Sequence, residues 1–393
     1  MYKRDLNSSF AYFVTKLPVV ALLGPRQSGK TTLATTTFKR YRYINFENIN
    51  DRTFAQEDPQ RFLKENYNEY GIILDEIQHV PQLLSYIQLQ VDQEDRPGYF
   101  IITGSHNLLV NQAITQSLAG RVAILTLLPL SLHELQENNI LPDSLSHAIY
   151  YGGYPRVYAK NLLPLEFYPF YIQTYIERDV RQIINITNLS LFQRFLALCA
   201  GRIGQLLNLS SLAIDCGISV PTAKAWLSLL EASYIIYLLQ PHYKNFSKRV
   251  IKTPKLYFYD TGIACTLLGI QSQAQLSTHY LRGSLTECLI ITELKKYFLN
   301  QGKSPYLYFW QDSHGHEIDC VIDHGTHLIP IEIKSGETIT PDYFTSLEYW
   351  SSLTGMDPSK GFVVYGGTDN QPRSKGNVVS WRSLNRVFEH LKQ

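Results

Sequence analysis

The stretch Gly24-Pro25-Arg26-Gln27-Ser28-Gly29-Lys30-Thr31 has the complete G-x-x-x-x-G-K-T pattern of a phosphate-binding loop. Its glycines let backbone N–H groups close on phosphate oxygens, Lys30 offers a cation to the β- and γ-phosphates, and the Thr31 hydroxyl is a ligand for Mg²⁺. We therefore expect this loop, together with Thr32, to bind ATP and Mg²⁺.

The residues on either side of the loop favour this interpretation. Leu17 to Leu23 is a short apolar run that predicts a buried parallel strand leading into the loop. Residues Thr31 to Phe38 predict a helix whose N-terminus faces the phosphates, where the helix dipole favours an anion. The alternative is a chance Gly/Ser turn before a helix, but strand, loop and helix follow one another in the required order.

A second apolar strand, Gly71 to Leu74, ends in two carboxylates, Asp75 and Glu76. Asp75 is expected to make the water-mediated Mg²⁺ contact of a Walker B strand, and Glu76 to polarise the attacking water. Two acids at a strand end also occur in solvated turns, so the interpretation depends on the loop upstream.

A third strand, Pro97 to Ser105, ends in hydroxyl groups. In additional-strand ATPases such a strand lies between the other two, and Thr103 or Ser105 would sense the γ-phosphate. The alternative is an ordinary strand followed by a Thr-Gly-Ser turn.

Two arginines are candidates for neutralising charge in the transition state. Arg121 precedes the apolar run Val122 to Leu127 and would act in cis or from a neighbouring subunit; it could equally be a surface arginine at a strand start. Arg26, inside the loop, is the weaker candidate.

The composition narrows the class of protein. The chain has 393 residues, 45% of them hydrophobic and 18% charged, which predicts a soluble globular protein of two or three domains. A net charge of +2 does not support a protein that coats polyanions. The five cysteines lack C-x-x-C spacing, which argues against zinc and a disulfide framework. No signal peptide or membrane span is visible, so we expect a cytoplasmic protein.

The order of elements predicts four parts. Residues 1–138 alternate strand and helix, as in a P-loop ATPase domain with a parallel sheet. A helical lid or connector is expected over 139–188, a winged-helix domain over 189–262, and a second α/β domain over 263–393. The strands of the first part are predicted at Val19–Leu23, Tyr43–Phe46, Ile72–Leu74, Phe100–Thr103 and Val122–Leu127, and Ser131 is expected to cap a helix through Glu137.

The winged-helix prediction rests on a helix-turn-helix pattern. Ser210 is expected to cap a helix to Cys216, Gly217 to make the turn, and Ser219 to cap a second helix through Glu231. Strands are predicted at Tyr234–Leu239 and Lys255–Tyr259, with Lys244 to Arg249 as a basic wing tip. DNA binding by the second helix is one interpretation. Because that helix offers only Lys224 as a cation, a lid or protein-docking role is the alternative.

The C-terminal part contains a second acidic constellation. A helix is predicted at Thr286–Leu294, and strands at Tyr306–Trp310, Glu317–Ile322 and Leu328–Ile333. Glu332 and Lys334 point to the same side of their strand, and Asp319 on the neighbouring hairpin strand can meet them. With Glu287 from the helix, the carboxylates would hold Mg²⁺ while Lys334 orients a water against a phosphodiester. This is the layout of a restriction-endonuclease-like site.

A solvated cross-strand pair is the alternative to a metal site here, because Glu-x-Lys is common in strands. The flanking residues are apolar, however, and a buried charge needs a reason. His314 and His316 are interpreted as hairpin-loop residues beside this site.

Taken together, these motifs resemble a group of uncharacterised bacterial and archaeal AAA-type ATPases with a C-terminal domain of unknown function. The resemblance covers nearly the whole chain and implies ATP binding, a winged-helix segment and an endonuclease-like C-terminal domain. Ile318-Asp319 stands where a stricter nuclease motif has Pro-Asp. The residues that carry the resemblance are Gly24 to Thr32, Leu74 to Gln78, Thr103 to Ser105, Gly120-Arg121, Gly152 to Pro155, Glu177 to Asp179 and Ile331 to Gly336.

The leading hypothesis is an α/β protein with a Mg²⁺-dependent ATPase whose nucleotide state repositions the other domains on a partner, such as DNA or another nucleic acid. The first alternative adds metal-dependent cleavage by Glu287, Asp319, Glu332 and Lys334. The second is a non-enzymatic ATP switch that docks a protein partner. An oligomer is compatible with each hypothesis.

Overall fold

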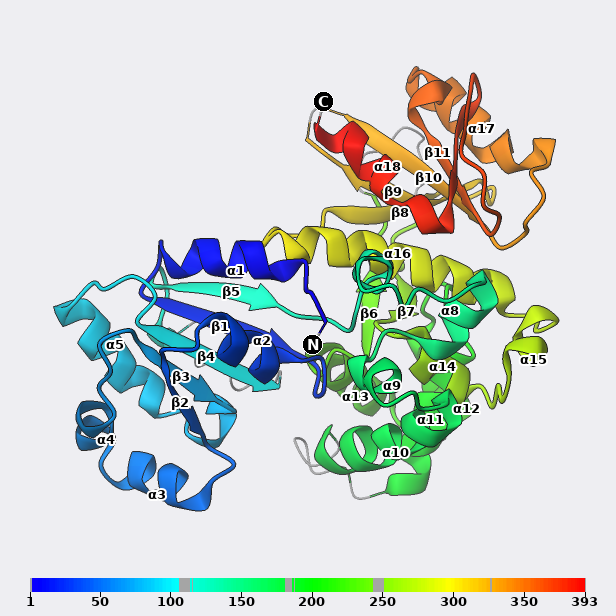
Figure 1. The fold of residues 1–393 in the computed structure, drawn as a ribbon. Coiled ribbons are helices and arrows are strands. Elements are labelled where there is room, and N and C mark those ends of the chain that lie inside the picture. The colour runs from blue at the N-terminus through cyan, green and yellow to red at the C-terminus, as the bar shows by residue number, and fades with distance from the viewer. Residues whose placement is uncertain are drawn as a thin grey trace.

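The computed structural model describes residues 2–105, 114, 116–180, 186, 188–242, 251–325 and 327–392. These residues form a mixed α/β structure with an N-terminal parallel sheet and a C-terminal sheet, with a mainly helical region between them (Figure 1). No helix in this part of the chain combines the length and the apolar character needed to cross a membrane.

The N-terminal sheet has the strand order β2-β3-β4-β1-β5, and all four pairings are parallel. The third predicted strand therefore lies between the strand before the loop and the Asp75 strand, as expected. One apolar cluster fills the face under α3, α4 and α5, and another fills the face under α1 and α2. The elements are α1 (Leu6–Val14), β1 (Val19–Gly24), α2 (Lys30–Thr37), β2 (Arg42–Asn45), α3 (Ile49–Glu57), α4 (Pro59–Glu65), β3 (Ile72–Asp75), α5 (Leu83–Gln93), β4 (Phe100–Ser105) and β5 (Val122–Thr126).

The central region contains the predicted helix-turn-helix elements followed by a two-stranded antiparallel sheet. Ser131 and Ser219 cap their helices as predicted, and Gly217 ends α12 in the left-handed conformation. The predicted cap at Ser210 is wrong, because Asn208 accepts the Ser211 N–H at 2.9 Å and the helix begins at Leu209. The predicted wing tip, Lys244 to Arg249, lies outside the described residues.

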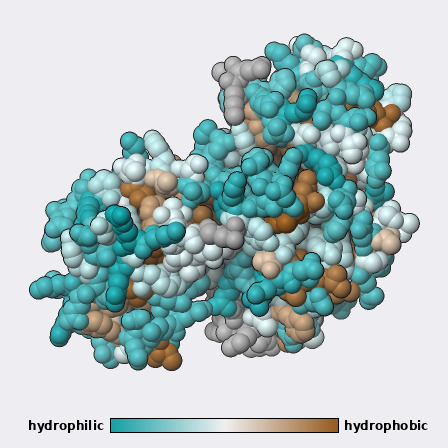
Figure 2. Space-filling view, viewed as in Figure 1, coloured by the Kyte–Doolittle hydropathy of each residue, from teal (hydrophilic) through white to brown (hydrophobic). Residues whose placement is uncertain are grey.

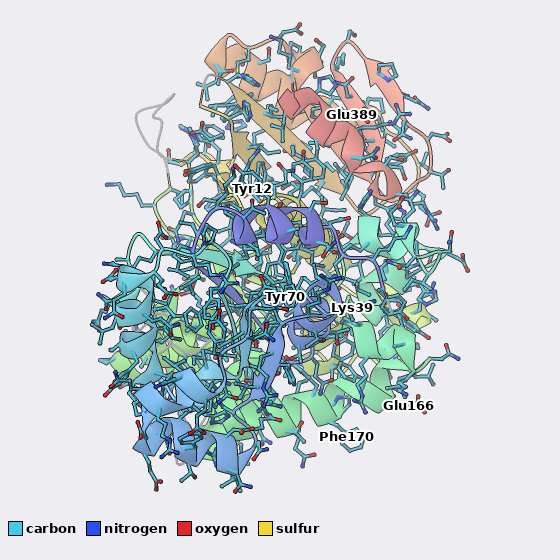
Figure 3. All side chains as sticks on the ribbon, turned by 60° about the vertical axis from the view of Figure 1, so that its left-hand side comes forward. Tyr12, Lys39, Tyr70, Glu166, Phe170 and Glu389 are labelled. Atoms are coloured by element: carbon cyan, nitrogen blue, oxygen red, sulfur yellow. The ribbon has the colours of Figure 1, made fainter. Side chains whose placement is uncertain are left out.

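The elements of this region run from α7 to α15. They are α7 (Leu132–Glu137), α8 (Leu145–Tyr151), α9 (Pro155–Ala159), α10 (Pro164–Tyr171), a π-helix (Ile172–Val180), α11 (Leu189–Ala200), α12 (Leu209–Cys216), α13 (Val220–Ala232), β6 (Ile236–Leu239), β7 (Lys255–Phe258), α14 (Thr261–Leu267) and α15 (Gln273–Ser277). In Figure 3, Glu166 and Phe170 mark the outer side of α10, where Phe170 is exposed.

The C-terminal sheet has the order β12-β13-β11-β10-β9-β8. β8, β9 and β10 are antiparallel neighbours, whereas β11 runs parallel to β10 and to β13. The predicted helix and the three predicted strands are confirmed. The elements are α16 (Arg282–Asn300), β8 (Leu307–Gln311), β9 (Glu317–Asp323), β10 (Leu328–Lys334), α17 (Thr345–Thr354), β11 (Phe362–Tyr365), β12 (Gln371–Arg373), β13 (Gly376–Ser380) and α18 (Asn385–Glu389).

Helix α16 connects the three regions, and Figure 1 shows it running between them. Glu293 accepts the Leu132 N–H at 2.6 Å, at the start of α7. Lys296 donates to the Leu130 carbonyl at 2.8 Å. On the same face of the helix, one turn before Lys296, the Thr292 hydroxyl donates to the Phe258 carbonyl of β7 at 3.2 Å. A single buried helix therefore holds the parallel sheet, the small sheet and the C-terminal domain together.

The small sheet also meets the edge of the C-terminal sheet. His242 N donates to the Phe309 carbonyl at 2.7 Å, and Ile251 N donates to the Gln311 carbonyl at 3.1 Å. His242 and Ile251, which flank the segment predicted as a wing tip, are thus bonded to β8. The face of the molecule in Figure 2 is largely hydrophilic, with small separate hydrophobic patches.

Candidate functional site

The phosphate-binding loop leaves the carboxyl end of β1, where the backbone must turn sharply. Gly24 has φ +150°, and a Cβ atom there would lie 2.2 Å from the Leu127 carbonyl oxygen. Gly29 has φ +99° at the start of α2. Only glycine fits both conditions easily, so these two positions explain why the loop needs glycines where it has them.

Lys30 is buried, and its ammonium group is folded back onto the loop. Its Nζ donates to the carbonyl oxygens of Gly24 at 3.0 Å and Pro25 at 2.8 Å. Burial lowers the pKa of Lys30 to about 8, although the charges of Glu76 and Asp75 oppose the shift. A triphosphate would give this ammonium the anionic partner that the loop carbonyls lack.

Side chains from α2, β2 and β4 converge on the Asp75 carboxylate. Its carboxylate accepts hydrogen bonds from the Thr31 hydroxyl at 3.0 Å, the Tyr43 hydroxyl at 2.8 Å and the buried Thr103 hydroxyl. Thr31 and Asp75 are hydroxyl and carboxylate oxygens, the ligand types that Mg²⁺ prefers. The residues present therefore fit a nucleotide-bound Mg²⁺ ion.

The structure separates the two hydroxyls at the end of β4. Thr103 bonds to Asp75, so its hydroxyl orients the carboxylate, whereas Ser105 lies 3.4 Å from Glu76 and accepts from Gln78 at 3.1 Å. Glu76 has a left-handed backbone, with φ +58°, directly after β3. That uncommon conformation holds the second carboxylate at the sheet edge beside the loop.

Sequence reasoning missed three residues of this site. Tyr43 on β2 contacts the Asp75 carboxylate, and Gln78 after β3 contacts the Glu76 carboxylate. Their positions near the end of the strand that carries Asp75 could have indicated them. Arg4 donates to the Ser28 carbonyl at 2.7 Å, to the Leu128 carbonyl at 2.6 Å and to Glu134 at 2.9 Å. Nothing in the local sequence around Arg4 indicates that it supports the loop.

Arg121 is not part of the site in this chain. Its carbonyl accepts from the N–H of Val19, the first residue of β1, so it lies at the edge where the parallel strands begin. The phosphate-binding loop is at the opposite edge. The Arg121 guanidinium pairs with Asp92, with Nη2 3.0 Å from Oδ2. The prediction of action in cis is therefore wrong, and only action from a neighbouring subunit stays a prediction. Arg26 lies 3.5 Å from Glu47.

The acidic residues of the C-terminal domain form a second cluster. Carboxylate oxygens of Glu287, Glu317 and Asp319 all lie within 4.8 Å of one another. Lys255 Nζ, which comes from β7, is 3.0 Å from Glu287 and is also bonded to Glu317. Tyr257 donates to the same Glu287 oxygen. Neither Glu317 nor the two β7 residues were predicted; the period-2 spacing of Glu317 and Asp319 was the available signal.

Glu332 and Lys334 lie on the strand beside Asp319. Lys334 Nζ is 2.9 Å from Glu332 Oε2, and Asp319 accepts the Ile333 N–H at 2.7 Å. Glu332 is 2% exposed, and its Oε1 has no hydrogen-bond partner among the described residues. Asp319 thus lies beside the strand of Glu332 and Lys334, but the carboxylate oxygens that lie within 4.8 Å of one another include Glu317 in place of the predicted ligand Glu332. His316 instead bonds to Asp312 at 3.0 Å, in the β8–β9 turn.

Burial dominates the electrostatics of this cluster. It raises the pKa of Glu287 to about 7 and that of Glu332 to about 8. Lys255 opposes the shift at Glu287, and Lys334 opposes it at Glu332, while repulsion from Asp319 adds to both shifts. The carboxylates thus lack full compensation by the two lysines.

Comparison with known families divides the chain into three parts. Residues 16–136 match the AAA domain, residues 142–274 match a domain of unknown function (DUF8612), and residues 282–384 match another (DUF4143). Uncharacterized proteins of Mycobacterium bovis and Mycobacterium tuberculosis are each 28% identical over 377 residues, which is 95% of this chain and 82% of each relative.

Two solved structures match this chain with low TM-scores. A Walker-type ATPase of Pyrococcus abyssi is 15% identical, with a TM-score of 0.41 over 68% of this chain and 96% of its own. A signal transduction ATPase with numerous domains from Pyrococcus horikoshii is 13% identical, with a TM-score of 0.22 over 74% of this chain and 47% of its own. TM-scores this low support no inference about the fold or the function of this chain. The N-terminal part of the chain is thus similar to the AAA domain over residues 16–136, and its C-terminal part is similar to the DUF4143 domain over residues 282–384.

Proposed function

We propose that the chain is a Mg²⁺-dependent ATPase whose nucleotide state acts on the helical region and the C-terminal domain. The observation that carries this proposal is the convergence of the Thr31 hydroxyl and the Asp75 carboxylate beneath the phosphate-binding loop, with 3.0 Å between their oxygens. The AAA domain match supports ATP binding at this place.

Each residue has a role set by its position. Lys30 would bind the β- and γ-phosphates, and Thr31 and Asp75 would hold Mg²⁺, which polarises the phosphates when bound. Glu76 would accept a proton from the attacking water, and Ser105 and Gln78 would orient that carboxylate.

Substitution of the loop lysine tests the proposal. Lys30→Ala should weaken ATP binding at least 100-fold in a fluorescent-nucleotide titration and abolish turnover. The matched control is Lys39→Ala, which removes an exposed lysine just beyond α2, labelled in Figure 3. Full ATPase activity in Lys30→Ala would refute the assignment.

The helical region is joined to the loop by a tyrosine. The Tyr171 hydroxyl donates to the Arg26 carbonyl at 3.3 Å, and the Tyr154 hydroxyl donates to Tyr171 at 2.8 Å. Both tyrosines are buried, so a shift of the loop on nucleotide binding would be transmitted to α10. This contact supports the role of the helical region as a lid that responds to the nucleotide.

A nucleic acid is the proposed partner, because α12 and α13 have the helix-turn-helix order and the single cation of α13, Lys224, is exposed. A salt titration of DNA binding separates this partner from a protein. Binding to phosphates predicts a steep fall in affinity with salt, whereas a protein-docking module predicts little dependence. An ATP switch without turnover would appear as normal binding and no hydrolysis in a single-turnover measurement.

Metal-dependent phosphodiester cleavage is the second candidate function. It is favoured by Glu332 Oε1, which is buried without a partner beside Asp319 and Lys334. In this role the carboxylates would hold Mg²⁺ or Mn²⁺ and Lys334 would orient a water. A plasmid-nicking assay that compares the wild type with Glu332→Ala tests it. Absence of metal-dependent nicking in the wild type, with and without ATP, would exclude this function.

A further inference from the structure

Strand β7 places a lysine from the middle of the chain inside the acidic cluster of the C-terminal domain. Lys255 is 4% exposed, and its Nζ contacts Glu287 on α16 and Glu317 on β9. These are two of the three residues whose carboxylate oxygens lie within 4.8 Å of one another. The ammonium therefore stands where a shared cation would stand.

The cluster has more carboxylates than ammonium groups. Among the described residues, the carboxylates of Glu287, Glu317, Asp319 and Glu332 act on two lysines, Lys255 and Lys334. The second sign of missing positive charge is Glu332 Oε1, which is buried and has no partner. Burying a carboxylate costs free energy unless a positive charge compensates for it. The acidic cluster therefore favours a cation of higher charge than an ammonium group.

The geometry of the three carboxylates suits a small divalent cation. Oxygens on opposite sides of one Mg²⁺ ion are about 4 Å apart, since each Mg–O distance is about 2.1 Å. Only one pair among three ligand oxygens can be opposite, and the other pairs are about 3 Å apart, so oxygens that now lie up to 4.8 Å apart would close by about 1 to 2 Å when the ion binds. Mn²⁺ accepts the same oxygen ligands.

We infer that the ammonium group of Lys255 occupies the acidic cluster, and that it competes there with a divalent cation for Glu287, Glu317 and Asp319. The inference rests on the metal site of the second candidate function. With Lys255 in place, the carboxylates are engaged and the site is closed to metal. Departure of Lys255 opens it.

The lysine side chain, and not the strand, is the part that moves. Leu256, Tyr257 and Phe258 are fully buried, and the Phe258 carbonyl is bonded to Cys288 and Thr292 of α16. Lys255, by contrast, is the first residue of β7 and has a long flexible side chain. Its Nζ also lies 5.4 Å from the centroid of the Phe309 ring, an aromatic face that attracts a cation.

Manganese binding to the full chain without nucleotide tests the inference. Bound and free Mn²⁺ are separated by electron paramagnetic resonance in the wild type, Lys255→Met and the double variant Lys255→Met/Glu317→Gln. We expect Lys255→Met to bind one Mn²⁺ at least tenfold more tightly than the wild type does, and the double variant to lose that gain.

The matched control is Lys296→Met, because Lys296 is also buried and pairs with Glu293 on the same helix at 2.8 Å. It should bind Mn²⁺ like the wild type. A second measurement uses the wild type alone. Mass spectrometry after amine labelling should show Lys255 unreactive without metal and at least fivefold more reactive with Mn²⁺, while Lys296 stays unreactive.

The inference would be overturned if Lys255 did not compete with the metal, or if the metal site did not exist. A wild type that binds Mn²⁺ as tightly as Lys255→Met would leave the metal site standing but show that Lys255 does not compete. A folded Lys255→Met without the gain, or an unchanged Lys255 reactivity in saturating Mn²⁺, would have the same meaning. If no variant binds Mn²⁺, the metal site itself is wrong. Loss of ATP binding would instead concern the nucleotide site, which these measurements leave out.

Discussion

The nucleotide site and the acidic cluster each contain a buried lysine near carboxylates, yet the two lysines are held differently. Lys30 bonds to two backbone carbonyls of its own loop, whereas Lys255 bonds to two carboxylates on other elements. Burial accordingly lowers the pKa of Lys30. Burial also acts to lower the pKa of Lys255, but the charges of Glu287 and Glu317 outweigh it and the pKa is raised.

This difference bears on what each site can do. A lysine that bonds only to carbonyl oxygens has no anionic hydrogen-bond partner. A phosphate that enters the site can therefore form a strong hydrogen bond with it. A lysine held between carboxylates already has its anions, so an incoming cation must displace it. The first site is therefore prepared for its ligand, and the second is closed by part of its own chain.

The largest expected effect concerns the chemistry of the nucleotide site. Glu76→Gln should keep ATP affinity within about threefold but reduce turnover by about 100-fold or more, because the amide cannot accept the proton from water. A nucleotide titration and a single-turnover assay on the same preparation measure the two. Normal turnover in Glu76→Gln would show that this carboxylate is not the base, and another group would then have to accept the proton from water.

A partly exposed lysine, Lys295, extends this comparison of lysines with and without a bonded anion. Lys295 lies over the Tyr237 ring, with Nζ 4.6 Å from its centroid, and burial lowers its pKa to about 8 despite the opposing charge of Glu231. The unfolded chain then binds more protons between pH 8 and 10.5, so folding stability should rise with pH across that window.

Replacement of this lysine should remove that pH dependence. Lys295→Met is expected to raise the free energy of unfolding at pH 7 by about 2 kcal/mol, because no charge is then buried. Lys255→Met should do the opposite, since it leaves Glu287 and Glu317 without their ammonium. Urea unfolding at pH 7 and pH 10 measures both. Equal effects of the two substitutions would contradict the distinction drawn between the lysines.

The nucleotide site also depends on one distant residue. Arg4→Lys should weaken ATP binding by about tenfold, because an ammonium cannot reach Ser28, Leu128 and Glu134 together. Turnover at saturating ATP should change little. A matched control is Lys3→Arg, one position earlier in the chain. Unaltered affinity in Arg4→Lys would mean that the loop holds its shape by itself.

The smallest expected effect tests whether nucleotide binding reaches the helical region. Tyr171→Phe removes the bond to the Arg26 carbonyl and should change ATP affinity by about threefold. Tyr158→Phe is the control, because the Tyr158 hydroxyl donates to the Gly152 carbonyl at 2.7 Å instead of to the loop. Isothermal titration of both variants decides it; identical affinities would remove this route between the regions.

The sequence by itself determined the nucleotide site, because its requirements are local. Glycines at 24 and 29, a lysine and a hydroxyl residue follow one another in a single turn, and the strand ending in Asp75 has its own apolar pattern. It also indicated the order of strands, since β4 was expected between its two neighbours. Ser131, Ser219 and Gly217 were found because caps and turns depend on neighbouring residues.

Tertiary structure decided the contacts between residues far apart in the chain. Arg4 reaches the loop from 24 residues away, and Lys255 reaches Glu317 across 62 residues. Arg121 looked like a member of the nucleotide site until the strand direction placed it at the opposite sheet edge. Spacing along the chain shows which residues share an element. Only the packing of α16 against β7 and β9 shows that the acidic cluster receives its lysine from the middle of the chain.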